Sequence, residues 1–278
     1  MASFGDISVP YQNDLRVLMK YISTLVNLGY ETIAINRTVS PDVKGKGGQD
    51  KIPGPPNLTS LPGLEDLKKT CPKLKLLSRI TVIIEDQQQV RFIPGETVQS
   101  YDIVSVQPTN EKLFQQISQA VECDVISFDM TSRMPFYIKH PQVNLAIERG
   151  VSFEILYAPA IRDESLRKHT ITNALELIRV CKGRNVVMSS GAEQTIELRG
   201  PYDIINLGLL FGLKPDQSKA TVSRNVRSII YHAEARNKTV KGAVSLEKMP
   251  VPASSVKRGH ENVEQSKESD LKSKKFKV

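Results

Sequence analysis

One stretch, residues 151–213, limits the folds that this 278-residue chain can adopt. Two short β-rich runs, residues 153–157 and 185–189, flank a long segment in which apolar residues recur at helical spacing. A second helical segment follows and is apolar on almost every side. A strand, a crossover helix and a strand in this order form a parallel βαβ unit. The stretch therefore predicts an α/β fold with a parallel sheet.

The same alternation of strands and helices extends over most of the chain. Strand-like runs at residues 3–8, 32–35, 76–85, 101–106 and 124–128 precede the two above, and residues 195–198 are a possible eighth. Sustained alternation is typical of a doubly wound sheet or of a closed barrel. Because no dinucleotide-binding glycine motif follows the first run, we expect a TIM-barrel-like parallel β/α barrel.

Residues 37–72 interrupt this pattern with Pro, Gly and Lys, and one turn of helix is expected near residues 64–68. An irregular segment of this length inside a compact domain is usually an insertion on the surface. We therefore predict a single barrel domain over residues 1–236 that carries an insertion at 37–72.

The C-terminal 42 residues differ from the body in composition. Residues 237–278 hold ten Lys or Arg and five Asp or Glu, so this segment accounts for +5 of the net charge of +8. Without a buriable apolar face it is expected to be disordered. Two of its basic clusters resemble a nuclear import signal, although a merely solvated basic tail has the same composition. They comprise Lys257, Arg258, Lys272, Lys274, Lys275 and Lys277.

Several classes of protein are disfavoured by what the sequence lacks. The N-terminus has neither the basic nor the apolar region of a secretory signal, and no apolar run has the length of a membrane span. The three cysteines are far apart and odd in number, which disfavours a disulfide framework or a zinc site. We expect an intracellular protein whose thiols are reduced.

The residues at strand ends offer little for catalysis. The four histidines are scattered and none directly follows a strand, so a multi-histidine metal site is not expected. Residues 189–191, Ser-Ser-Gly, lack the surrounding motif of a nucleophile elbow. Four carboxylates at strand ends offer ligands for a hard cation, but such residues more often cap helices; they are Asp6, Glu85, Asp86 and Asp129. The sequence predicts no metal site and no cofactor.

The sequence offers more candidate residues for phosphate binding than for catalysis. Ser189 and Ser190 begin a small-residue loop late in the barrel, where backbone N–H groups often bind phosphate, although a plain tight connection fits equally well. Arg184 and Arg199 flank the last βα unit, and each is suited either to phosphate or to a neighbouring carboxylate. In the last helix basic and aromatic side chains share one face, which suits an RNA backbone or simply solvent: Arg224, Arg227 and Tyr231. Four more cations near loops could likewise either contact an RNA backbone or simply face solvent: Lys139, Arg149, Arg162 and Arg167.

Five segments carry a resemblance to a known family. RITVII, PFYIKHP, NLAIERGVSFEILYAPAIRD, NALELIRVCKGRNVVMSSGAE and RGPYDIINLGLLFGL occur in order before residue 236. Together they resemble the thirty-kilodalton protein subunit family of eukaryotic ribonuclease P, which is shared with ribonuclease MRP. The resemblance is weak in residues 37–72 and in the tail. Arg79 and Lys182, which lie within these segments, complete the set of candidate RNA contacts.

The resemblance implies a barrel related to metal-dependent phosphoesterases and a role in supporting a catalytic RNA that removes the 5′ leader of precursor tRNA. It further implies a small α/β protein partner and a location in the nucleus and nucleolus. The first hypothesis is thus a non-catalytic, RNA-contacting subunit of a ribonucleoprotein. A phosphoesterase of the same barrel class and a protein-only scaffold are the alternatives.

Overall fold

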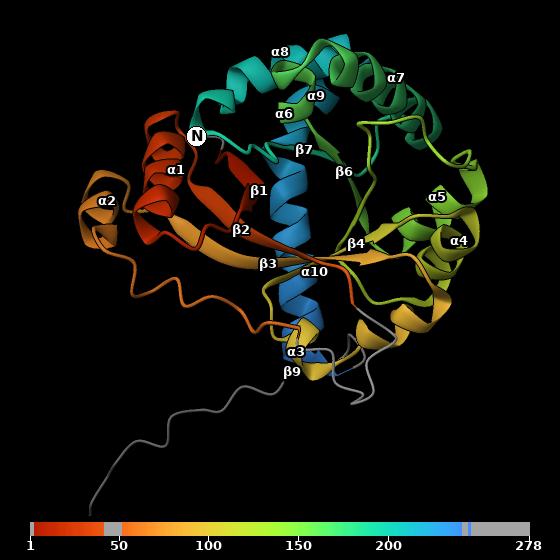
Figure 1. The fold of residues 1–278 in the computed structure, drawn as a ribbon, viewed down its shortest axis with the longest axis horizontal. Coiled ribbons are helices and arrows are strands. Elements are labelled where there is room, and N and C mark those ends of the chain that lie inside the picture. Colours follow the sequence, from red (N-terminus) through yellow and green to blue (C-terminus); the bar gives the residue numbers. More distant parts are fainter. Residues whose placement is uncertain (1–2, 42–51, 241–243, 246–278) are drawn as a thin grey trace, which may run out of the picture. The chain divides into compact units, whose positions relative to one another are not determined.

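A computed structural model describes residues 3–41, 52–240 and 244–245 of the chain. Its main sheet is an all-parallel barrel in which the strands pair in the order of the sequence (Figure 1). The strands are β1 (Gly5–Pro10), β2 (Thr32–Val39), β3 (Lys75–Ile84), β4 (Ile103–Pro108), β5 (Val125–Ser127), β6 (Ser152–Leu156) and β7 (Val186–Ser189). The predicted barrel and its seven strands are confirmed. The possible eighth strand is wrong, because Thr195–Glu197 forms a 3₁₀ turn, η2.

The barrel is nearly closed at the seam between β1 and β7. The N–H of Gly191 donates to the carbonyl of Ser8 at 2.9 Å. The Asp6 carboxylate accepts the N–H groups of Ser190 and Ser8, both at 3.1 Å. The Asp6 side chain thus accepts N–H groups that a backbone carbonyl would accept in regular strand pairing. This contact joins β1 to the end of β7.

Helices cover the outside of the sheet, and three of them begin at an Asp or Asn side chain that accepts N–H groups of the first turn. Asp14 caps α1 (Leu15–Asn27), Asn110 caps α4 (Glu111–Ala120) and Asp163 caps α7 (Glu164–Cys181). Lys182 and Gly183 end α7 with positive φ angles of 55° and 69°. The remaining helices on the outside are α2 (Leu64–Thr70), α3 (Glu96–Gln99), α5 (His140–Glu148), α6 (Ala158–Arg162), α8 (Pro201–Leu210) and α9 (Pro215–Thr221). In the described part of the chain no helix is both long and apolar enough to cross a bilayer.

The structure refines three predicted boundaries. β2 continues to Val39, three residues into the predicted insertion, and the expected turn near residue 64 is α2. The last helix, α10 (Arg224–Lys238), extends past residue 236, and β8 (Thr239–Val240) pairs with β9 (Val244–Ser245). The short elements η1 (Gln87–Phe92), α3 and α6 were not predicted. The predicted import clusters lie outside the described residues.

The barrel interior contains a fully buried ion pair. Arg79 on β3 and Glu154 on β6 each have 1% of their side chain exposed, and both guanidinium NH groups reach the carboxylate at 2.5 Å. The same guanidinium donates to the carbonyl of Ile7 at 2.8 Å and to Ser105 Oγ at 3.0 Å. Each buried charge therefore has an opposite charge in bidentate contact, which offsets the cost of removing it from water.

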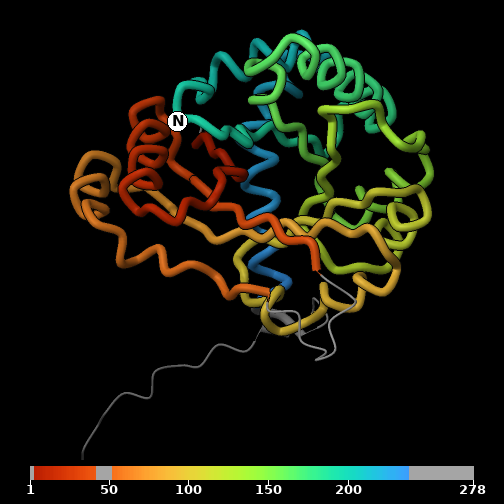
Figure 2. The backbone as a smooth tube through the Cα atoms, viewed as in Figure 1, coloured from red at the N-terminus to blue at the C-terminus, as the bar shows by residue number. Residues whose placement is uncertain are grey.

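Helix α10 covers the amino ends of the strands. Its apolar face packs against one early residue from each of six strands: Ile7, Ala34, Leu77, Ile103, Val125 and Val187. The contacting face consists of Val226, Ile229, Ile230 and Ala233. In Figures 1 and 2 this helix, drawn in blue, crosses the middle of the ring of strands behind β2 and β3. The α10 helix therefore closes one end of the barrel.

Polar contacts fix α10 in this position. The buried carboxylate of Asp124 accepts the N–H of Val104 at 2.8 Å, and it contacts His232 Nδ1 at 2.7 Å and Arg236 at 3.1 Å. His232 Nε2 lies 3.1 Å from the carbonyl of Arg149. Since both partners of the ring are acceptors, the doubly protonated imidazolium fits best. The hydrogen bond to Asp124 raises the pKa of His232 above its ordinary value, against the opposing effects of burial and of Arg236.

Replacing Arg79 by Met is expected to lower the free energy of unfolding by about 3–5 kcal/mol, because Glu154 would remain buried without its partner. The double variant Arg79→Met/Glu154→Leu should recover most of this loss. Urea unfolding followed by circular dichroism measures both. As a control, Arg179→Met breaks an exposed pair with Glu176 and should leave stability nearly unchanged. A single variant as stable as the unaltered chain would contradict this account.

The raised pKa of His232 gives its contribution to stability a definite sign. The contribution is fully present below the unfolded-state pKa of about 6.5 and is lost as pH rises through the folded-state value. The stability advantage of the unaltered chain over His232→Gln should therefore be larger at pH 5.5 than at pH 9, by on the order of 1 kcal/mol. Chemical denaturation at both pH values tests this, and an equal difference at the two would refute it.

Candidate nucleic-acid interface

The candidate cations lie at opposite ends of the barrel. Lys139, Arg162, Arg167 and Arg199 follow the carboxyl ends of strands, whereas Arg149, Lys182, Arg184, Arg224 and Arg227 lie near the amino ends. The 18 residues of α7 separate the two groups by about 27 Å at 1.5 Å per residue. The predicted residues therefore cannot form one compact site.

Cations at the carboxyl end are held by groups of the chain itself. Arg162 binds Glu197 through Nε at 2.7 Å and also pairs with Glu193 at 2.5 Å. Burial alone would raise the pKa of Glu197, but hydrogen bonds from Arg162 and from two backbone N–H groups outweigh it and lower that pKa. Lys139 pairs with Glu111 at 2.5 Å. These cations are already neutralised.

Two further arginines at this end, Arg167 and Arg199, bind backbone carbonyls. Arg167 Nε donates to Ala160 at 2.7 Å, and Arg199 NH1 donates to Ile196 and Leu198 at 2.7 and 2.8 Å. Tyr30 and Tyr157 hydrogen-bond the backbone of Arg199 at 3.0 and 3.2 Å. The loop around Arg199 is therefore a structural connection.

Three candidates correct the sequence prediction because they are buried. Arg79, Ser189 and Ser190 have no more than 1% of their surface exposed. Arg79 binds Glu154 inside the barrel, and the N–H of Ser190 donates to Asp6. Burial raises the pKa of the Asp6 carboxyl despite the opposing hydrogen bonds from Ser190 and Ser8. These residues present no side-chain surface to RNA in this structure.

Arg149 is half-buried and has a structural role. Its guanidinium donates to the carbonyls of Ile117 and Ser118, both at 3.0 Å, at the carboxyl end of α4. Carbonyls at a helix terminus lack intrahelical donors, and a cation there also favours the helix dipole. Arg149 thus caps α4.

The remaining cations, around the start of α10, are exposed and have no charged partner among the described residues. Arg224 and Arg227 lie on the outer face of α10, where Tyr231 is 68% exposed. Asn225 Nδ2 donates to the carbonyl of Val186 at 2.7 Å, which places this end of α10 beside the start of β7. Arg184, two residues before β7, makes a 2.8 Å hydrogen bond to neutral Asn144. We call Arg184, Arg224, Arg227 and Tyr231 the α10 face.

One nearby cation was missed by the sequence analysis. Lys219 is exposed on α9, and its carbonyl accepts the hydroxyl of Ser223 immediately before α10. The available signal was its position five residues before Arg224. Its proximity to the α10 face follows from the short connection between the two helices.

The strand-end carboxylates do not assemble into a metal site. Asp86 caps η1 through the N–H of Gln88, and Asp129 accepts the N–H and hydroxyl of Thr131. Glu85 is exposed. Across residues 3–41, 52–240 and 244–245, no three His, Cys, Asp or Glu side chains are grouped as metal ligands. Asp86 therefore caps a helical turn, as such residues commonly do, whereas Asp129 holds a local turn with Thr131.

Comparison with known proteins shows to which family the chain is similar. A family model described as RNase P subunit p30 matches residues 3–238. The ribonuclease P protein subunit p30 of Mus musculus is 42% identical over 255 residues, which cover 91% of this chain and 94% of that protein. The ribonuclease P/MRP protein subunit RPP1 of Saccharomyces cerevisiae is 31% identical over 82% of this chain and 76% of its own length.

The fold is also shared with a solved structure. A chain in the cryo-EM structure of archaeal ribonuclease P with mature tRNA matches with a TM-score of 0.64 and 18% identity, covering 88% of this chain and 98% of that chain. At this identity the likeness concerns the fold, and the sequence relationship rests on the family model and the two eukaryotic relatives. The chain belongs to the ribonuclease P subunit p30 family.

Proposed function

We propose that this chain is a non-catalytic, RNA-contacting subunit of ribonuclease P and of ribonuclease MRP, and that it supports RNA-catalysed removal of the 5′ leader from precursor tRNA. Family membership over residues 3–238 is the observation that carries the proposal. Its expected partners are the catalytic RNA, a small α/β protein subunit and, through the assembly, precursor tRNA. It is expected to work in the nucleus and nucleolus.

The α10 face is the part of the surface best suited to the RNA backbone. Arg224, Arg227 and Arg184 keep guanidinium groups that are free of carboxylates in the described structure. Such groups gain the most by neutralising phosphates and releasing counterions. The exposed ring of Tyr231 offers a surface on which an unpaired base can stack.

Removing two of these cations should weaken RNA binding without weakening the fold. For Arg224→Ala/Arg227→Ala we expect the affinity of the purified chain for its RNA to fall roughly tenfold, and the salt dependence of binding to decrease by about one to two ions. Filter binding at several salt concentrations measures both effects.

A matched control removes two exposed cations one helical turn apart on another helix. Arg16→Ala/Lys20→Ala on α1 makes the same change in net charge, and it should reduce affinity much less. Equal losses in the two double variants would show that only total charge matters, and would refute the assignment to the α10 face. Binding that is independent of salt in the unaltered chain would favour a protein-only scaffold.

The non-catalytic role has a separate test. The purified chain, given Mg²⁺, Mn²⁺ or Zn²⁺, should neither cleave precursor tRNA nor hydrolyse phosphate esters, whereas an assembly purified through the tagged chain should remove the 5′ leader. Nuclease treatment of the assembly should abolish that activity. Turnover by the chain alone, together with a stoichiometric metal content, would establish the phosphoesterase alternative instead.

A further inference from the structure

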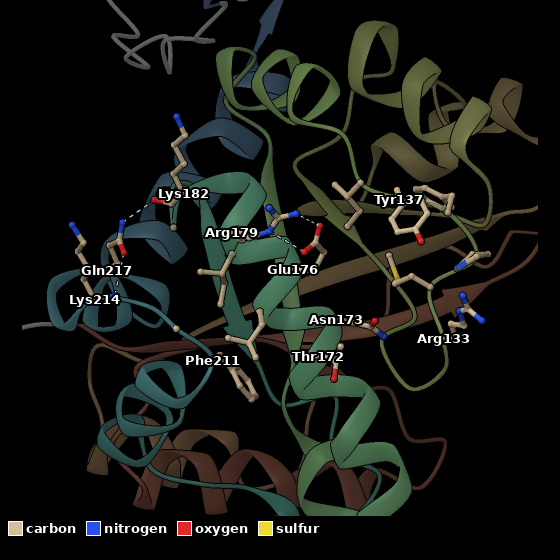
Figure 3. Close-up of a pocket in the computed structure, with 18 residues that line it drawn as sticks. Arg133, Tyr137, Thr172, Asn173, Glu176, Arg179, Lys182, Phe211, Lys214 and Gln217 are labelled. Atoms are coloured by element: carbon tan, nitrogen blue, oxygen red, sulfur yellow. Dashed lines mark hydrogen bonds and ion pairs between the residues drawn. The ribbon is translucent and has the colours of Figure 1, made fainter.

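A trough of about 1280 Å³ lies over the outer face of α7 (Figure 3). Its floor is a stripe of α7 at helical spacing: Thr172, Leu175, Glu176 and Arg179. One wall is the loop at residues 133–138, and the other is formed by Phe211, Gly212, Lys214 and Gln217 at the junction of α8 and α9. We call this feature the α7 trough.

Hydrogen bonds hold both walls in place. Asn173 Nδ2 on α7 donates to the carbonyls of Met130 and Ser132 at 3.0 and 2.8 Å, which fixes the start of the loop wall. Gln217 Nε2 donates to the carbonyl of Lys182 at 2.9 Å, which ties α9 to the end of α7. The trough is therefore formed before any partner binds, so that binding need not order these segments.

The wall at the junction of α8 and α9 also lies close to α7. Gly212 has a φ of 90°, and a Cβ added there would lie 3.1 Å from Leu175 Cδ2. A side chain at this position would be strained by the backbone and would crowd the floor. The absence of a side chain at Gly212 thus lets this wall lie close to Leu175.

The trough is apolar inside and cationic at its rim. Leu175 is 43% exposed and Tyr137 is 79% exposed, and the side chains of Met134, Phe136, Ile138 and Ile178 also line it. Arg133, Lys182 and Lys214 stand at the rim without a charged partner among the described residues, and Glu176 is already paired with Arg179 at 2.7 Å. Large aromatic and aliphatic side chains left in contact with water usually mark an interaction surface.

We propose that the α7 trough binds an amphipathic α-helix of a partner protein, with the helix's apolar face on Leu175 and Tyr137 and its flanking carboxylates on Arg133, Lys182 and Lys214. A helix is about 10–12 Å wide with its side chains, so the trough has room for roughly three turns. Apolar residues at i, i+3, i+4 and i+7 would follow the α7 stripe. The proposal rests on the proposed function only in assuming that the chain works inside an assembly.

Charge and composition select this occupant. Residues 246–278 of the chain itself hold eight Lys or Arg against five Asp or Glu, so the cationic rim repels them. RNA would satisfy the rim, but phosphates and riboses gain little from an aliphatic floor such as Leu175, Ile138 and Ile178. An acidic amphipathic helix satisfies both the rim and the floor.

Site-specific cross-linking tests the proposal in the assembled complex. A benzophenone amino acid replaces Tyr137, and the assembly is purified through the tagged full-length chain before irradiation. The expected product joins this position to a protein segment that has apolar residues at helical spacing and flanking Asp or Glu. The same amino acid at Tyr202, an exposed tyrosine of α8 that does not line the trough, is the control and should not capture that segment.

Two substitutions test the chemistry of the contact. Leu175→Asp should reduce the yield of the specific cross-link roughly tenfold, because it places a charge on the apolar floor. Arg133→Glu/Lys214→Glu changes two exposed rim residues and should reduce the yield about as strongly, whereas Arg133→Lys/Lys214→Arg should preserve it. Unchanged thermal unfolding of each variant confirms that the barrel is intact.

The possible failures are distinct. A cross-link from position 137 to RNA, to a segment without the acidic amphipathic pattern, or to nothing would overturn the trough proposal, even if the assembly contains RNA and processes precursor tRNA. An assembly without RNA or processing activity would overturn the proposed function, even if the expected protein segment is captured.

Discussion

The bidentate ion pair between Arg79 and Glu154 joins strands β3 and β6 through the inside of the barrel. A buried arginine cannot lose its proton, so the interior is stable only while the carboxylate stays within reach. The guanidinium also holds the carbonyl of Ile7 on β1. Three strands that are distant in sequence are thereby linked through one cation. The centre of the barrel is occupied by the protein's own charges.

The two ends differ in how their charges are used. At the carboxyl end of the strands, where TIM barrels carry their chemistry, Arg162 is bound by Glu193 and Glu197. At the amino end α10 lies across the strands, and its His232 and Arg236 both bind the Asp124 carboxylate. Arg224 and Arg227, on the outer side of α10, have no carboxylate partner in the described part of the chain. Closing the barrel with a helix therefore creates a new exposed basic surface at the end where a typical barrel has none.

Sequence periodicity identified the seven strands because each is a short apolar run between polar turns, and it identified α7 and α10 because each has a buried stripe. It failed for Thr195–Glu197, where two β-branched residues and a glutamate form a 3₁₀ turn that holds Glu197 against Arg162. Sequence periodicity also gave no reason to exclude Arg79 from the candidate RNA contacts. The partner of Arg79 lies 75 residues away, and no local pattern announces a pairing that exists only when the barrel closes.

The same reasoning explains why the candidate sites could be identified by residue type but not by location. A sequence gives the number of cations, whereas RNA binding depends on which cations have no carboxylate or carbonyl partner once the chain has folded. Arg149 and Arg167 look like Arg224 in the sequence, yet the first two bind backbone carbonyls. The cations that the described structure leaves without a charged partner include Arg224 and Arg227 on α10, which we propose for RNA, and Arg133, Lys182 and Lys214 at the rim of the α7 trough, which we propose for a protein partner.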